Sequence, residues 1–142
     1  MKSPLLVILP AHCTDPEAAL KKTLEHFRLN DDLPYSMQKH HWDYWYYPES
    51  WIAQPGIAES FPSLPAELAG NIGLVERLSR SDYWTGVLTP DLQWRDLQDH
   101  GWRLTHDPSP ENQAAAAAWA KEYASILDRY PGHLAAGVIV HM

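Results

Sequence analysis

The sequence predicts a single α+β domain, a two-layer sandwich in which two main helices cover one face of a mainly antiparallel sheet. The chain has 142 residues, a length typical of one domain. Apolar or aromatic runs alternate with helical patterns in the order strand, helix, strand, loop or short helix, hairpin, helix, strand. The sequence has no internal repeat and no evident linker, so we expect one domain over residues 1–142. A ferredoxin-like topology is the preferred variant.

The first two elements are a buried strand and an amphipathic helix. Residues 5–9 form a continuous apolar run between two prolines, which indicates a strand buried on both faces. Thr14 or Asp15 can cap the helix that follows, and Pro16 suits its first turn. The spacing of apolar residues predicts its buried face, formed by Leu20, Leu24 and Phe27.

The middle of the chain is rich in aromatic residues and then in proline. A strand is predicted over residues 42–47, and its alternation places Trp42, Tyr44 and Tyr46 on one face. Residues 53–66 contain three prolines and a glycine, which predicts an irregular loop that acts as a lid or wall. A short helix is predicted over residues 65–80, although two glycines weaken it.

The last third of the chain carries the clearest signals. Residues 83–89 and 93–96 flank Pro90-Asp91, which predicts a hairpin. Ser109 and Pro110 start a helix that is expected to run to about residue 129. Residues 135–140 then form a final buried strand.

The composition excludes several functional classes. Eighteen acidic and 11 basic residues give a formal net charge of -7, which argues against a surface that neutralises the phosphates of duplex DNA or RNA. The apolar runs are too short for a secretory signal or a membrane span. Cys13 is the single cysteine, so no disulfide framework exists. We therefore expect a cytoplasmic protein that needs no cofactor and contacts no membrane.

Residues 40–51 combine three Trp, three Tyr, two His and two carboxylates. Aromatic rings with polar tips stack planar ligands, anchor partners or cement interfaces. Asp43 lies inside this aromatic box, and a carboxylate between rings is costly to bury without a partner. It is expected either to contact a ligand or to pair with one of three residues, His41, His141 and Arg95.

Three further tryptophans, Trp84, Trp94 and Trp102, recur through the hairpin region. At least one is expected in a core cluster of aromatic rings. Trp94 precedes Arg95, and Trp102 precedes Arg103. An indole beside a guanidinium can stack a base and hold a phosphate, which favours a nucleotide-type ligand.

Eight histidines raise the question of metal or acid–base chemistry. No His-x-x-x-His or Glu-x-x-His pair occurs, so no metal site is expected. His12 precedes Thr14 at the end of the first strand, which is half of the motif of two-histidine phosphodiesterases. His141, at the end of the last strand, has a matching position without the hydroxyl residue. Thr14 as a helix cap and His12 as a loop residue form the simpler interpretation.

The motifs resemble those of an uncharacterised family of small proteins from bacteriophages, prophages and their hosts. The shared features are a Trp-Asp-aromatic-Trp box at residues 42–45, a Val-x-Thr-Pro-Asp-x-x-Trp hairpin at residues 87–94, and a last strand that ends in His141. Relatives often carry Gly-Gly-Arg-Trp after the box, where this chain has Tyr-Tyr-Pro and later Trp51. The resemblance implies a role against host defence, by binding host effectors or by sequestering or degrading nucleotide signals.

Three functions are therefore considered. The first is a non-enzymatic protein that captures a nucleotide-type ligand in an aromatic pocket. The residues expected to line this pocket are Trp42, Asp43, Trp45, Trp94, Arg95 and Trp102. The second is a metal-independent phosphodiesterase that uses His12 with His141 or His100. The third is an inhibitor that binds a host protein through exposed aromatic residues. A homodimer is plausible under all three.

Overall fold

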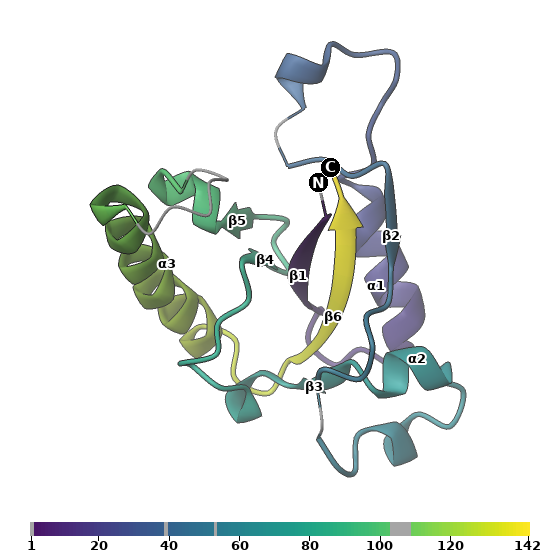
Figure 1. Ribbon diagram of the computed structural model, residues 1–142. Helices are drawn as coiled ribbons and strands as arrows, with labels where there is room; N and C mark the ends of the chain where they lie inside the picture. The colour runs from purple at the N-terminus through teal and green to yellow at the C-terminus, as the bar shows by residue number, and fades with distance from the viewer. Residues whose placement is uncertain (1, 39, 53, 103–108) are drawn as a thin grey trace.

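A mixed six-stranded sheet forms the centre of the protein in the computed structural model, which describes residues 2–38, 40–52, 54–102 and 109–142 (Figure 1). The strands are β1 (Lys2–Ile8), β2 (Tyr44–Tyr46), β3 (Ile72–Leu74), β4 (Gly86–Leu88), β5 (Trp94–Asp96) and β6 (Leu134–His141). The α-helices are α1 (Pro16–Glu25), α2 (Ala66–Ala69) and α3 (Pro110–Asp128). Among the described residues, no helix is long and apolar enough to span a membrane.

The strand order is β2-β6-β1-β4-β5, and β3 also pairs with β6. β6 pairs with β1 in antiparallel fashion, from His141 opposite Lys2 to Ala135 opposite Ile8. The other edge of β6 pairs with β2 near its carboxyl end and with β3 near its amino end. β4 runs parallel to β1 and antiparallel to β5. The α+β class and the predicted hairpin are therefore confirmed.

The topology differs from the ferredoxin-like variant in one pairing. That variant is a split unit, in which another strand lies between the two parallel strands, whereas β1 and β4 are direct neighbours here. All three residues of β4 are buried, which suits a position inside the sheet. β5 is buried at Trp94 and Asp96 but not at Arg95, which suits the edge.

The two main helices lie on opposite faces of the sheet (Figure 1). Leu5 and Val7 of β1 pack in one core cluster with Leu20 and Leu24 of α1. The alternate residues of β1 pack in a second cluster with α3, and this cluster includes Leu6, Ile8, Trp119, Tyr123 and Ile126. The expectation that both helices cover one face is wrong. Because all residues of the apolar run are buried, both faces of β1 require a covering layer.

The helix ends follow the predicted chemistry. Asp15 rather than Thr14 caps α1, since its side chain accepts a hydrogen bond from the Ala18 amide at 3.1 Å. Ser109 caps α3 in the same way, accepting from the Asn112 amide at 3.1 Å. The final strand is also confirmed, and Gly132, with φ +80°, provides the left-handed residue in the turn before it.

The helix predicted over residues 65–80 is wrong. Within this range, the only α-helical residues are those of α2, and β3 begins shortly after α2 ends. Gly73 lies in β3 against the side chain of Gln54, where a Cβ atom would collide. The Gln54 amide accepts a hydrogen bond from the Leu74 amide at 2.6 Å and donates to the Leu74 carbonyl at 3.1 Å. These contacts hold the segment extended. The loop before it is irregular as expected, apart from a 3₁₀ turn at Ala58–Ser60, with residue 53 outside the described residues.

Candidate functional site

The six predicted ligand residues do not share one pocket. Trp42 is buried beneath the sheet, where its indole N–H donates to the Leu24 carbonyl at 2.7 Å. Trp45 lies on β2, packs against the cluster that contains α1, and meets the Tyr47 ring edge-on at 5.3 Å. Trp94 and Trp102 line a common cavity at another part of the sheet.

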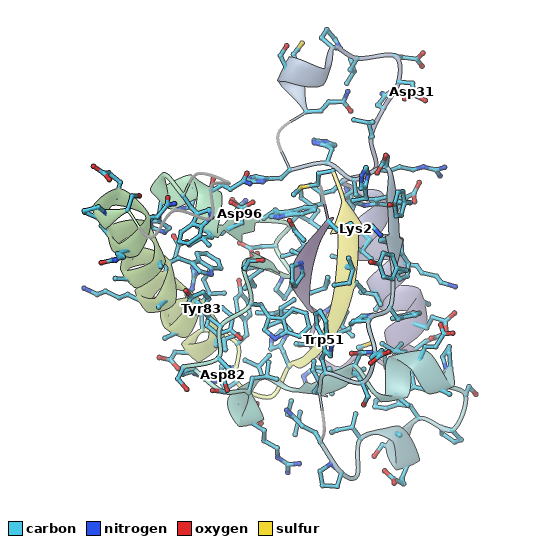
Figure 2. The ribbon with its side chains drawn as sticks, viewed as in Figure 1. Lys2, Asp31, Trp51, Asp82, Tyr83 and Asp96 are labelled. Atoms are coloured by element: carbon cyan, nitrogen blue, oxygen red, sulfur yellow. The ribbon has the colours of Figure 1, made fainter. Side chains whose placement is uncertain are left out.

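This cavity, the Trp94 pocket, has a volume of about 250 Å³. It opens where β1 extends beyond β4, because the pairing of these strands begins at Leu5 and Gly86. Thr85, just before β4, donates from its hydroxyl to the Pro4 carbonyl at 3.2 Å. The lining residues are Lys2, Ser3, Pro4, Leu5, Thr85, Gly86, Trp94, Asp96, Leu97, Gln98, Trp102, Val140 and Met142. In Figure 2, the labelled Lys2 and Asp96 lie at this upper end of the sheet.

Gly86 keeps one wall of the Trp94 pocket open. A Cβ atom at this position would lie 3.2 Å from the Leu5 side chain and 3.6 Å from the indole nitrogen of Trp94. A larger residue would therefore occupy space between the strand and the indole.

The Trp94 ring is held rigidly. It is 6% exposed, and the Phe27 ring meets it edge-on at 5.3 Å. His40 stacks on it at 5.7 Å with an interplanar angle of 13°. Two aromatic neighbours thus fix the plane of the indole.

His40 is fixed in turn by two carboxylates, and we call these three residues the His40 clamp. Its Nδ1 lies 3.1 Å from Asp96 Oδ2, and its Nε2 lies 3.3 Å from Asp99 Oδ1. The remaining carboxylate oxygens form a capping box at the 3₁₀ helix Leu97–His100, which fixes their orientation. Burial alone would lower the pKa of His40, but hydrogen bonds and charges from Asp96 and Asp99 outweigh it and raise the pKa.

The same three residues are types that ligate transition metals, and their ligand atoms lie within 4.8 Å of one another. Each ring nitrogen of His40, however, faces a different carboxylate. The ring therefore lies between two carboxylate acceptors, an arrangement that suits the two N–H donors of an imidazolium. A bound metal would require one ring nitrogen to face both carboxylates together, so the geometry is that of an ion-paired clamp.

Arg95 lies outside the Trp94 pocket. Its guanidinium contacts the Glu122 carboxylate of α3 through Nε at 3.2 Å and Nη2 at 2.9 Å. This hydrogen bonding raises the pKa of Arg95. Alternation along β5 points Trp94 and Arg95 to opposite faces. The arginine is therefore a bridge between β5 and α3, while Arg103, the other predicted neighbour of an indole, lies outside the described residues.

Asp43 pairs with one of its three predicted partners. Its Oδ1 lies 2.6 Å from His141 Nδ1, and this hydrogen bond lowers the pKa of Asp43. The His141 ring stacks on Tyr44 at 4.6 Å with an interplanar angle of 6°. The three side chains form a small surface cluster at the carboxyl end of β6.

The histidines of the phosphodiesterase hypothesis lie far apart. His12 follows the carboxyl end of β1, whereas His141 lies opposite Lys2 at the amino end of that strand. At roughly 3.3 Å per residue, the length of the strand pair alone separates them by about 20 Å. His100 lies elsewhere, with its Nε2 3.4 Å from Glu122. The structure does not assemble these residues as an acid and a base.

Sequence reasoning missed His40, Asp96 and Gln98. The spacing Asp96-x-x-Asp99 is a capping pattern that a search for helix starts can find. No local signal identifies His40 as its partner, because Asp96 lies 56 positions after His40 in the sequence. Comparison of the chain with protein-family models, curated proteins and solved structures found no match.

Proposed function

We propose that this protein binds a small planar ligand of nucleobase type in the Trp94 pocket and releases it unchanged. The observation that supports this most is the pairing of a rigid buried indole, Trp94, with a second, half-buried indole, Trp102, around one cavity. The volume of about 250 Å³ is just below the range of about 300–1,000 Å³ usual for small-molecule sites. It suits a base or nucleoside better than a dinucleotide.

The polar lining supports recognition of a base edge. Gln98 has an exposed side chain that carries both a donor and an acceptor, and Thr85 adds a hydroxyl. Asp96 accepts hydrogen bonds at the inner end of the pocket, where its charge disfavours a phosphate. Lys2 is the single cationic side chain among the described lining residues. A phosphate of the ligand is therefore expected near Lys2, whose ammonium lies 5.5 Å from the centre of the Tyr46 ring, and not near Arg95, which is paired with Glu122.

The biological setting follows from the resemblance to small phage proteins. In that setting, the proposed binding would sequester a nucleotide signal of the host and so weaken its defence. The protein would act in the host cytoplasm as an accessory protein without catalysis.

The test is a panel of bases, nucleosides, nucleotides and cyclic nucleotides, followed by thermal unfolding and calorimetry. A ligand should raise the melting temperature by mass action and should be recovered intact by mass spectrometry. Trp102→Ala should remove one stacking wall, and Gly86→Ala should narrow the cavity. Each should weaken binding about tenfold or more. Trp45→Phe, an indole change outside the pocket, is the matched control.

Two outcomes would reject this proposal. One is no response to any compound of the panel. The other is recovery of a cleaved ligand, which would make the protein an enzyme.

Exposed tyrosines support a second candidate, an inhibitor that binds a host protein or a second copy of this chain. Tyr44 and Tyr46 on β2 are 43% and 40% exposed, and their rings stack at 6.5 Å. β2 lies at the edge of the described sheet, where a partner strand can pair. A complex formed by the natural protein and lost in Tyr44→Ser/Tyr46→Ser, measured by light scattering, supports this candidate. Equal complex formation by both proteins contradicts it.

A further inference from the structure

A second hollow lies on the same side of the sheet as α3, and we call it the Trp51 pocket. It has a volume of about 410 Å³ and shares the Pro4–Thr85 wall with the Trp94 pocket. Its lining residues are Pro4, Trp51, Asp82, Tyr83, Trp84 and Thr85. Figure 2 labels three of them, Trp51, Asp82 and Tyr83, in the lower half of the view.

Three aromatic rings surround this hollow. Trp51 and Trp84 lie 5.6 Å apart at an interplanar angle of 57°, so their faces are not stacked flat on each other. Trp84 packs over Gly137 of β6, where a Cβ atom would collide with the indole. Its carbonyl also accepts a hydrogen bond from Trp119 of α3 at 2.7 Å. The contacts with Gly137 and Trp119 thus fix the position of Trp84 in the wall of the hollow.

The two remaining rings are placed by other elements. The centre of the Tyr83 ring lies 6.4 Å from the centre of the Tyr123 ring of α3, with an interplanar angle of 59°. Trp51 is held through its backbone, since its amide donates to Asn71 Oδ1 at 3.1 Å. Its side chain is 52% exposed, so much of the ring surface remains open to solvent.

The charge at this hollow is negative. Asp82 is the single carboxylate among the described lining residues, and no Lys or Arg side chain lines the hollow. Arg77 lines an adjoining hollow that also contacts Trp51, Trp84 and Asp82. Arg80, two residues before Asp82, is paired with Asp128 at 3.0 Å. A cation that enters the Trp51 pocket would meet three aromatic side chains and one carboxylate.

From this arrangement, we propose that the Trp51 pocket binds an organic cation with a quaternary or methylated ammonium head. Ring faces carry the negative part of the aromatic quadrupole, and such cages recognise quaternary ammonium groups because the methyl groups shed water easily. Asp82 adds an opposite charge at the rim. A quaternary head forms no N–H hydrogen bond, which agrees with a lining whose hydroxyl, on Thr85, already donates to the Pro4 carbonyl.

The experiment titrates choline and tetramethylammonium into the full chain, with sodium chloride at matched ionic strength as the blank. The indole N–H signals in two-dimensional NMR report the site, because the chain has seven Trp. We expect the Trp51 and Trp84 signals to move and the Trp45 signal to stay. The neutral isostere 3,3-dimethyl-1-butanol should bind at least about fivefold more weakly.

Two variants test the parts of the cage separately. Trp51→Ala changes an exposed ring and should weaken binding about tenfold. Asp82→Asn keeps the shape of the side chain and should weaken it about threefold, more at low salt. Trp45→Phe should bind the cations as the natural protein does. Phosphatidylcholine vesicles, compared with free choline, show whether the head group is accepted from a lipid surface.

The proposal is overturned if neither cation moves the Trp51 and Trp84 signals. It is also overturned if the neutral isostere binds as tightly as choline, or if Trp51→Ala binds choline unchanged.

Discussion

The two faces of the sheet use aromatic side chains in different ways. On the α1 face, Trp42 and Trp94 are each 6% exposed, and both are fixed by hydrogen bonding or ring contacts. On the other face, Trp119 of α3 is buried between its helix and the sheet. Tyr44 and Trp51 are not covered by the helix and remain exposed. The cover provided by a helix, and not the residue type, therefore decides whether a ring is core or surface. The predictions below measure how strongly the two faces differ.

The largest effect is expected for Trp119→Ala. This ring of α3 is fully buried against the sheet, and its indole N–H donates to the Trp84 carbonyl at 2.7 Å. Its removal leaves a cavity and an unpaired carbonyl, so the free energy of unfolding should fall by about 3–5 kcal/mol. Urea titration measures the loss. Trp51→Ala, at an exposed position on the same face, should change the free energy of unfolding by about 0.5 kcal/mol or less.

Trp42→Phe tests the closed face with a smaller change. Phenylalanine keeps most of the buried ring but cannot donate to the Leu24 carbonyl, which lies at the end of α1. The free energy of unfolding should fall by about 1–2 kcal/mol. Trp51→Phe is the matched substitution on the open face, and equal losses for the two variants in urea would show that the faces do not differ.

The His40 clamp ties the segment before β2 to the pocket wall and should make stability depend on pH. The pKa of His40 is raised in the folded protein, so its contribution is complete below the unfolded value of about 6.5 and is lost as the pH rises through the folded value. His40→Asn tolerates the left-handed backbone, φ +56°. It should cost on the order of 1 kcal/mol at low pH. Urea titrations at several pH values should show that this cost shrinks as the pH rises, and a constant cost contradicts the clamp.

Asp43→Asn should have the smallest effect, because the Asp43–His141 pair is on the exposed side of β2. The pKa of Asp43 is lowered, so its contribution is present above the unfolded value of about 3.9 and is lost as the pH falls through the folded value. Salt should reduce this contribution further. Thermal unfolding near neutral pH should differ only slightly between the variant and the natural protein. A loss as large as that of Trp42→Phe would show that this surface cluster is structural.

The outer elements of the fold could be predicted because their signals are local. Pro16, Ser109 and the Pro90-Asp91 turn mark element boundaries by the chemistry of single residues, and all three are correct. The apolar run of β1 even implied that both faces are covered, although the helices were assigned to one face. The strand β3 could not be predicted, because its extended form depends on contacts between Gly73 and Gln54 across a loop.

The candidate site was only partly predictable, because some of its contacts join segments that are distant in the sequence. Trp94 and Trp102 could be selected as exceptional indoles, and both line one cavity. Alternation along a strand already separates Trp94 from Arg95, so the shared role expected for them conflicts with strand geometry. The stacking of His40 on Trp94 depends on how a distant segment packs, and no spacing in the sequence reports it.

The pairing of the first strand with the last has a consequence for how the chain folds. β6 lies between β1 and both β2 and β3, so three strands share a partner that is synthesised after all of them. Until β6 emerges, one edge of β1 and its apolar run at residues 5–9 have no strand beside them. Sheets dominated by such distant pairings fold in about milliseconds to seconds. The nascent chain therefore exposes the apolar edge of β1 to aggregation until β6 is synthesised, and this is the stage at which chaperones would protect it.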